Sequence, residues 1–203
     1  MKESDDSDRH RAKMAKRKAL QDAEVAGKAI EQKGLLIVHT GPGKGKTTAA
    51  FGLALRALGR GFKIGVVQFI KGAWETGERF AFERFGEQVV WRTMGEGFTW
   101  NTQDRARDVS AAMAAWGVAQ EMMADPSIRL LVLDELNIAL RYDYLPLGDV
   151  VAALRARRPE LHIVVTGRNA KPELIEAADL VVELAAVKHH FAAGVKAQLG
   201  IEF

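Results

Sequence analysis

Short apolar runs alternate with longer amphipathic segments along the chain from residue 35 onward. The runs are apolar at consecutive positions, as in parallel strands that are buried on both faces, and the segments between them are typical of helices. Strands are predicted at 35–39, 63–69, 89–93, 129–133, 161–165 and 180–184. Helices are predicted at about 46–59, 77–85, 103–124, 147–157 and 171–177. This order predicts an α/β fold in which helices flank a doubly wound, mainly parallel sheet of about six strands.

The first 33 residues have a different texture, dense in charges of both signs. Their sizeable apolar side chains are few, namely Met14, Leu20, Val25 and Ile30. Such a segment buries little apolar surface by itself. Two interpretations stay open: a solvated tail, or a helix that orders against a ligand or a second subunit. We therefore divide the chain into a charged segment at 1–33 and a single domain at 34–203.

The composition of the chain excludes several classes of function. The formal charge of +3 and the pI near 9.2 suit a polyanionic ligand. No cluster of Lys and Arg interleaves with aromatic residues in the body of the chain, so we predict no nucleic-acid partner. The chain has no cysteine, which excludes disulfides, thiolate metal ligands and a cysteine nucleophile. With no apolar stretch of transmembrane length and no signal peptide, we predict a cytoplasmic protein without membrane contact.

A glycine-rich loop joins the first predicted strand to the first predicted helix. It reads Gly41-Pro42-Gly43-Lys44-Gly45-Lys46-Thr47-Thr48. The pattern predicts a phosphate cradle, because backbone N–H groups turn inward, Lys46 adds a cation and Thr47 offers a hydroxyl to Mg²⁺ or Mn²⁺. Nucleotide-binding residues are predicted at Gly41, Gly43, Lys44, Gly45, Lys46, Thr47 and Thr48.

The loop departs from the usual spacing by one residue. The pattern G-x-x-x-x-G-K-[ST] places a glycine at position 40, where this chain has Thr40 followed by Gly41. Because of this displacement, we do not assume that the chain transfers the γ-phosphoryl group as ordinary P-loop enzymes do.

Two carboxylates end the predicted strand 129–133. Asp134 and Glu135 follow Leu130-Leu131-Val132-Leu133 directly, as expected where the carboxyl end of a parallel strand faces a ligand. Mg²⁺ on a triphosphate needs oxygen ligands from Thr47 and a nearby acid. Adjacent strand residues point to opposite faces, so one acid approaches the metal and the other braces the loop; the sequence does not say which. With the glycine-rich loop, this motif predicts a P-loop NTPase-like fold that binds a nucleoside triphosphate.

Several further motifs occur together and in a fixed order. They are Gly65-Val66-Val67-Gln68-Phe69-Ile70-Lys71-Gly72, Gly97-Phe98-Thr99-Trp100, Val132-Leu133-Asp134-Glu135-Leu136, Tyr142-Asp143-Tyr144-Leu145-Pro146-Leu147, Thr166-Gly167-Arg168 and His190-Phe191-x-x-Gly194-Val195-Lys196-Ala197-Gln198-x-Gly200-Ile201-Glu202. From about Gly34 to the last residue the chain strongly resembles the P-loop corrinoid adenosyltransferases, and the offset glycine loop is part of that family's pattern.

The resemblance implies transfer of the 5′-deoxyadenosyl group of ATP to cobalt(I) of a corrinoid, with triphosphate as the leaving group, in adenosylcobalamin biosynthesis or salvage. It implies ATP, Mg²⁺ and a corrinoid acceptor, which is cobalamin, cobinamide or cob(I)yrinic acid a,c-diamide. In the family ATP lies reversed in the loop, so that ribose faces the acceptor. The resemblance also implies a homodimer, an electron-donating flavoprotein, and an N-terminal segment that covers ATP.

An aromatic pair and two arginines complete the expected site. The resemblance implies that Phe98 and Trp100 wedge beneath the corrin ring and exclude an axial ligand, which eases reduction of cobalt(II); without it, they would cap the core. Arg56 matches a family arginine near the nucleotide, but a solvated helix face fits equally well. Arg168 follows the strand 161–165, where a guanidinium clamps phosphate or pairs with an acid.

The remaining polar residues carry weaker expectations. Lys71 and Glu78 flank the loop after strand 63–69 and would reach ribose or Mg²⁺, or stay solvated. His189 and His190 lack the helical spacing of a metal pair, so we predict no metal there.

Two other functions stay open on the sequence. One is a small P-loop kinase or ATPase, which would produce ADP. The other is a nucleotide-dependent binding module whose basic N-terminal segment docks a partner.

Overall fold

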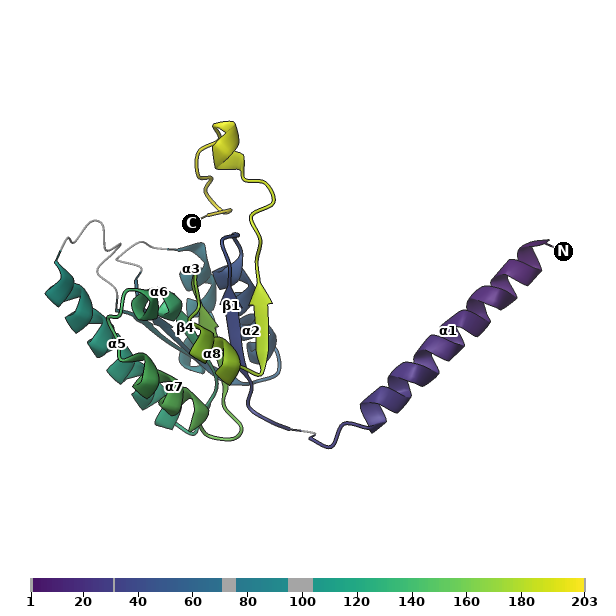
Figure 1. The fold of residues 1–203 in the computed structure, drawn as a ribbon, viewed down its shortest axis with the longest axis horizontal. Helices are drawn as coiled ribbons and strands as arrows, with labels where there is room; N and C mark the ends of the chain where they lie inside the picture. Colours follow the sequence, from purple (N-terminus) through teal and green to yellow (C-terminus); the bar gives the residue numbers. More distant parts are fainter. Residues whose placement is uncertain (1, 31, 71–75, 95–103, 203) are drawn as a thin grey trace. The chain divides into compact units, whose positions relative to one another are not determined.

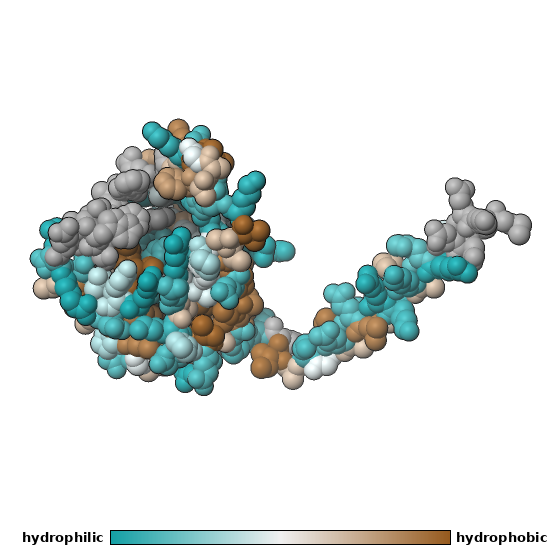
Figure 2. All heavy atoms as spheres, turned by 45° about the horizontal axis from the view of Figure 1, so that its top comes forward, coloured by the Kyte–Doolittle hydropathy of each residue, from teal (hydrophilic) through white to brown (hydrophobic). Residues whose placement is uncertain are grey.

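The computed structural model describes residues 2–30, 32–70, 76–94 and 104–202, with side chains from residue 7 onward (Figure 1). The chain divides into two compact units, Met1–Lys33 and Gly34–Phe203. The first contains one helix, α1 (Lys2–Ala26), and Figure 2 shows hydrophilic side chains along most of it. The helical conformation follows from a stretch rich in Lys, Arg and Ala, which are strong helix formers.

The second unit is built on a six-stranded parallel sheet with the order β3-β2-β4-β5-β1-β6. The strands are β1 (Leu36–Thr40), β2 (Lys63–Gln68), β3 (Val89–Thr93), β4 (Ile128–Asp134), β5 (His162–Thr166) and β6 (Leu180–Glu183). All six predicted strands are confirmed to within a residue at each end. The continuous apolar runs identified them because most of the strands have neighbours on both faces.

Helices follow the strands, as the sequence predicts. They are α2 (Lys46–Leu58), α3 (Gly77–Glu83), α5 (Arg105–Ala124), α6 (Leu136–Arg141), α7 (Leu147–Arg155) and α8 (Pro172–Ala177), with short 3-10 turns η1 (Gly86–Gln88) and η2 (His190–Ala193). The five predicted helices are confirmed, and α6 was missed. Only Glu135 separates it from the end of β4 at Asp134, and its six residues are too few to show a helical period.

Helices cover both faces of the sheet (Figure 1). On one face, α5, α6, α7 and α8 pack over buried Leu36, Leu131 and Ile163. On the other, α2 and α3 pack over a smaller cluster in which the rings of Phe51, Phe82 and Trp91 lie within 6 Å of one another. In the ranges that the structure describes, no helix is both long and apolar enough to cross a bilayer.

All strands are parallel, so their carboxyl ends meet at one edge of the sheet. Three neighbouring strands end there in register, because Gln68 is the Cα partner of both Thr93 on β3 and Asp134 on β4. β1 ends at Thr40 and β5 at Thr166. This polar edge is where the candidate site forms.

Candidate functional site

The glycine-rich loop (41–48) turns sharply between β1 and α2. Gly41 and Gly45 have φ angles of 94° and 102°, which glycine adopts without strain. The N–H of Gly43 donates to the Leu184 carbonyl at 2.7 Å. A Cβ on Gly41 would lie 2.5 Å from that same carbonyl oxygen, so the segment after β6 approaches too closely for any side chain there.

Thr40 explains why the first glycine of the usual pattern is displaced. It is the last residue of β1, it is buried, and its hydroxyl accepts a hydrogen bond from the Ala170 N–H at 3.0 Å. The side chain therefore ties β1 to the segment between β5 and α8, which a glycine in its place would not do. The turn itself begins one residue later, at Gly41.

Helix α2 presents its N-terminus to the site. Its N-cap is Gly45, which has no side chain to cap the first-turn N–H groups, and the first turn has no acidic residue. Uncapped N–H groups and the positive end of the helix dipole favour an anion at this position. The loop is thus suited to phosphate.

Lys46 lies inside the loop and only 6% of its surface is exposed. Its Nζ donates to the carbonyls of Gly41, at 3.0 Å, and Gly43. Burial lowers the pKa of Lys46 below its usual 10.5; nearby Glu135 partly offsets this, and Arg168 adds to it. A polyanion beside Lys46 would replace the lost hydration of the ammonium group.

Asp134 is the centre of a buried hydrogen-bond network and is fully buried. Its Oδ1 accepts from the hydroxyls of Thr47 and Thr166, both at 2.8 Å, and its Oδ2 accepts from Gln68 Nε2 at 3.1 Å. The hydroxyl predicted to serve a cation and one of the two candidate acids are therefore in direct contact across 87 residues of sequence.

Glu135 has a different environment from its neighbour. It has a left-handed backbone conformation with φ 64°, and its N–H donates to the Thr166 hydroxyl at 2.9 Å. Its side chain lines a cavity, and a Cβ added to Gly167 would lie 3.0 Å from Glu135 Oε2. The structure thus gives the two acids separate roles: Asp134 braces the loop through Thr47, and Glu135 faces the cavity.

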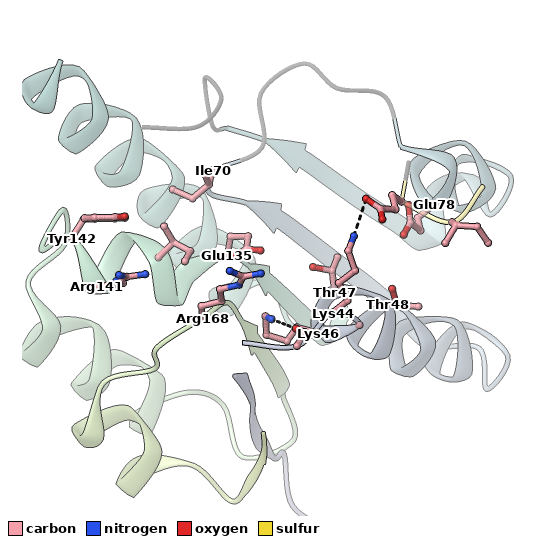
Figure 3. A pocket seen from close by; sticks show the side chains of 15 residues that line it. Lys44, Lys46, Thr47, Thr48, Ile70, Glu78, Glu135, Arg141, Tyr142 and Arg168 are labelled. Carbon is pink, nitrogen blue, oxygen red and sulfur yellow. Dashed lines mark hydrogen bonds and ion pairs between the residues drawn. The ribbon is translucent and has the colours of Figure 1, made fainter. Parts of the chain in front are cut away.

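A cavity of about 490 Å³ opens over the loop. Figure 3 shows Arg141 and Tyr142 toward one end and the side chains of the loop toward the other, with Glu135 and Arg168 between them. The lining residues are Gly43, Lys44, Gly45, Lys46, Thr47, Thr48, Ile70, Glu78, Glu135, Ile138, Arg141, Tyr142, Arg168, Ile201 and Glu202.

Most predicted site residues come together here. Gly43, Lys44, Gly45, Lys46, Thr47, Thr48, Glu135 and Arg168 line the cavity, as does Glu78. Gly41 accepts from Lys46 within the loop, and Asp134 holds the loop through Thr47. Arg56 lies in the last turn of α2, exposed and outside the cavity lining. The predicted aromatic residues Phe98 and Trp100, and Lys71, lie outside the described residues.

Sequence reasoning gave no role to two charged residues of the lining. Arg141 Nη1 lies 2.9 Å from the side-chain amide of Asn169, with the amide oriented to accept, and its guanidinium stacks over Tyr142 at 5.3 Å from the ring centre. Glu202 pairs with Lys44 Nζ at 2.9 Å and with His190 Nε2 at 2.7 Å. Glu202 belongs to the motif 190–202 and Tyr142 to the motif 142–147, but the motifs alone do not reveal a shared cavity.

The oxygen donors here fit a hard divalent cation. Thr47, Asp134 and Glu135 offer hydroxyl and carboxylate oxygens, the ligands that Mg²⁺ prefers. Among the described residues, no group of three or more His, Asp or Glu side chains converges as a metal site. A cation would therefore need further oxygens from a bound phosphate.

Fold and site together define a P-loop nucleotide-binding protein: a glycine-rich turn with a buried lysine, an acid at the end of a nearby parallel strand, and a cavity over both. The structure resembles the flagellar accessory protein FlaH from Methanocaldococcus jannaschii with a TM-score of 0.50 and 11% identity, covering 75% of this chain and 71% of that chain. At this identity the likeness shows the fold alone.

Comparison with known families is more specific. A model of the ATP:corrinoid adenosyltransferases BtuR/CobO/CobP matches residues 32–203, and a model of the Cob(I)alamin adenosyltransferase N terminal matches residues 1–25. A corrinoid adenosyltransferase of Pseudomonas aeruginosa is 56% identical over 100% of both chains. One from Salmonella typhimurium is 50% identical over 97% of this chain and 98% of its own. The chain belongs to the ATP:corrinoid adenosyltransferase family.

Proposed function

We propose that the cavity over loop 41–48 holds the triphosphate of ATP while a corrinoid attacks the sugar. The single observation that carries this proposal is the contact of the Thr47 hydroxyl with Asp134 beside the buried Lys46. It supports a phosphate position that would have a hydroxyl able to bind a cation, an acid and an ammonium group beside it. The resemblance within the family supports the assignment of a corrinoid as the acceptor.

The proposed reaction is a displacement at carbon. The electron pair of cobalt(I) forms the Co–C5′ bond, the C5′–O5′ bond breaks, and its electron pair leaves with the triphosphate. Cobalt(I) needs no general base, so the protein has two tasks: to hold C5′ in line with the metal and to stabilise the leaving group. Lys46, the first turn of α2 and Arg168 would serve the second task.

Mg²⁺ or Mn²⁺ is proposed to accompany ATP, where it would neutralise the charge that develops on the triphosphate. Thr47 would hold it with Asp134 behind, and Glu135 is the second acid within reach of the cavity. ATP is proposed to lie reversed, with its ribose toward the acceptor, which agrees with a loop whose turn begins at Gly41 and not at position 40.

Product identity tests this function against that of a kinase or ATPase. The assay combines the purified chain, ATP, Mg²⁺ and cob(I)alamin without oxygen. We expect triphosphate and a light-sensitive cobalt–carbon chromophore in equal amounts, whereas ADP or phosphate would refute transfer of the adenosyl group. Lys46→Ala should slow the transfer on the order of 10²-fold, as for loss of one electrostatic stabiliser.

Phe98 and Trp100 are proposed to exclude an axial ligand from cobalt. Alanine at either position should then reduce turnover that starts from cobalt(II) much more than turnover of chemically prereduced cobalt(I). Equal losses with both acceptors would assign the pair to the core.

The N-terminal unit is proposed to cover ATP, across a homodimer. Six of its residues between 9 and 18 are basic, namely Arg9, Arg11, Lys13, Lys16, Arg17 and Lys18, and they suit a polyanion. Deletion of residues 1–33 should raise KM for ATP, and unchanged kinetics would reject this role. Loss of a protein partner with ATP binding intact would favour a docking module instead. An electron-donating flavoprotein and a cytoplasmic location also stay predictions.

A further inference from the structure

A row of polar side chains crosses the edge of the sheet behind the site. Thr93, Gln68 and Asp134 end three adjacent strands in register. Gln68 is the middle member and only 3% of its surface is exposed. A buried amide in a sheet of Val, Leu and Ile is unfavourable unless its groups are paired, so its partners show what it does.

The hydrogen bonds of this row have a fixed direction. Trp91 Nε1 can only donate, and its N–H is shared at 3.2 Å between Thr93 Oγ1 and Gln68 Oε1. The Thr93 hydroxyl donates to the same oxygen at 3.0 Å. The amide oxygen must therefore face β3, and the amide nitrogen faces Asp134 Oδ2 at 3.1 Å. The opposite orientation would set the amide N–H groups against the indole donor.

The direction continues into the nucleotide site. Gln68 Nε2 donates to Oδ2 of Asp134, and the hydroxyls of Thr47 and Thr166 both donate to Oδ1. A hydroxyl has one hydrogen and two lone pairs. Because the Thr47 hydrogen points to Asp134, its lone pairs are left for a cation. Trp91 and Thr93, both on the edge strand, thus orient through one amide the carboxylate that accepts from the loop hydroxyl.

We propose that Gln68, oriented by Trp91 and Thr93, is a positioning residue for the cation that accompanies ATP. This inference rests on the proposed function. Gln68 is not among the residues that line the cavity; its amide holds the Asp134 carboxylate, which in turn holds the Thr47 hydroxyl. Supporting residues of this kind typically change metal affinity about 10- to 100-fold when they are replaced.

The test measures Mn²⁺ binding by electron paramagnetic resonance, with the full chain and adenosine 5′-(β,γ-imido)triphosphate. Gln68→Met keeps the volume and removes all three hydrogen bonds of the amide, and the dissociation constant of Mn²⁺ should rise at least about tenfold. Val67→Ala is the matched control, since it weakens the same strand on its other face and should leave Mn²⁺ binding unchanged. Thermal unfolding of both variants checks that they are folded.

The two donors on β3 supply a second test, because either alone can orient the amide. Trp91→Phe keeps a ring against Phe51 and Phe82, and Thr93→Val keeps the shape of the side chain. Each single variant should change the Mn²⁺ dissociation constant less than about twofold, and the double variant should approach Gln68→Met.

The outcomes separate the two proposals. If Thr47→Val weakens Mn²⁺ binding but Gln68→Met does not, the positioning role is overturned and the cation site stands. If Thr47→Val binds Mn²⁺ like the unmodified chain, the proposed cation site itself is wrong. Losses in Gln68→Met that Val67→Ala reproduces would also overturn the positioning role, because they would follow from strand stability alone.

Discussion

Lys44 Nζ lies 2.9 Å from a carboxylate oxygen of Glu202, so the glycine-rich loop is joined to the end of the C-terminal segment. The hydrogen bond from Lys44 lowers the pKa of Glu202, and the nearby histidines act in the same direction. Both residues line the cavity. The Glu202 carboxylate therefore pairs with the Lys44 ammonium group, which a bound triphosphate would also attract.

Removal of this carboxylate charge should free Lys44. Glu202→Gln is expected to lower KM for ATP about two- to fivefold at low ionic strength, with a smaller effect at high salt because the pair is partly solvated. In a Lys44→Ala background, Glu202→Gln should have no effect on KM. A rise in KM for Glu202→Gln alone would show that the segment is needed as a wall of the cavity.

The lowered pKa of Lys46 predicts a proton linkage. Burial depresses the folded pKa below 10.5, and bound triphosphate should raise it again. ATP binding should therefore take up protons at alkaline pH, between the free and bound pKa values. Calorimetry in two buffers of different ionisation enthalpy measures the uptake. Lys46→Arg, which keeps a charge that does not titrate, should abolish it; persistent uptake would assign the linkage to another group.

His162 predicts a dependence of stability on pH. Burial lowers its pKa, with Arg129 and Arg157 adding to the effect, and its Nδ1 accepts from the Leu35 N–H at 3.1 Å. Because the unfolded chain binds this proton more readily, stability should fall as pH drops below about 6.5. His162→Asn keeps an acceptor at the δ position without titrating. The variant should lose less thermal stability than the unmodified chain between pH 7.5 and 5.5, and an equal loss would contradict the assignment.

A side chain at Gly167 would both strain the backbone and crowd the site, and a second glycine allows the two effects to be measured separately. A Cβ there would lie 2.8 Å from Asn137 Cβ and 3.0 Å from Glu135 Oε2, and φ is +126°. Gly167→Ala should displace Glu135 and slow adenosyl transfer by up to about 100-fold. Gly61→Ala is the control, since Gly61 has φ +76° with nothing within 4 Å. Both should lose roughly 1–3 kcal/mol of stability from strain, but Gly61→Ala should keep its activity. Similar activities of the Gly167→Ala and Gly61→Ala variants would show that the position of Glu135 does not matter for adenosyl transfer.

The parts of the protein that could be predicted are those that depend on local patterns of residues. The apolar runs identified all six strands, and the loop 41–48 is contiguous, so its residues are neighbours in any fold. Sequence reasoning also placed Asp134 and Glu135 at the end of β4. It could not assign their roles, because alternation along a strand does not say which side holds the loop.

Only the tertiary structure decided which distant residues meet. The sheet order places β5 between β1 and β4, and Thr166 on β5 completes the contact of Thr47 with Asp134. Gln68 reads as part of an apolar strand until Trp91 and Asp134 are seen beside it. The physical reason is the parallel sheet itself: each strand needs a crossover before the next, so the residues that meet at its carboxyl edge are far apart in sequence, and no local pattern records their contacts.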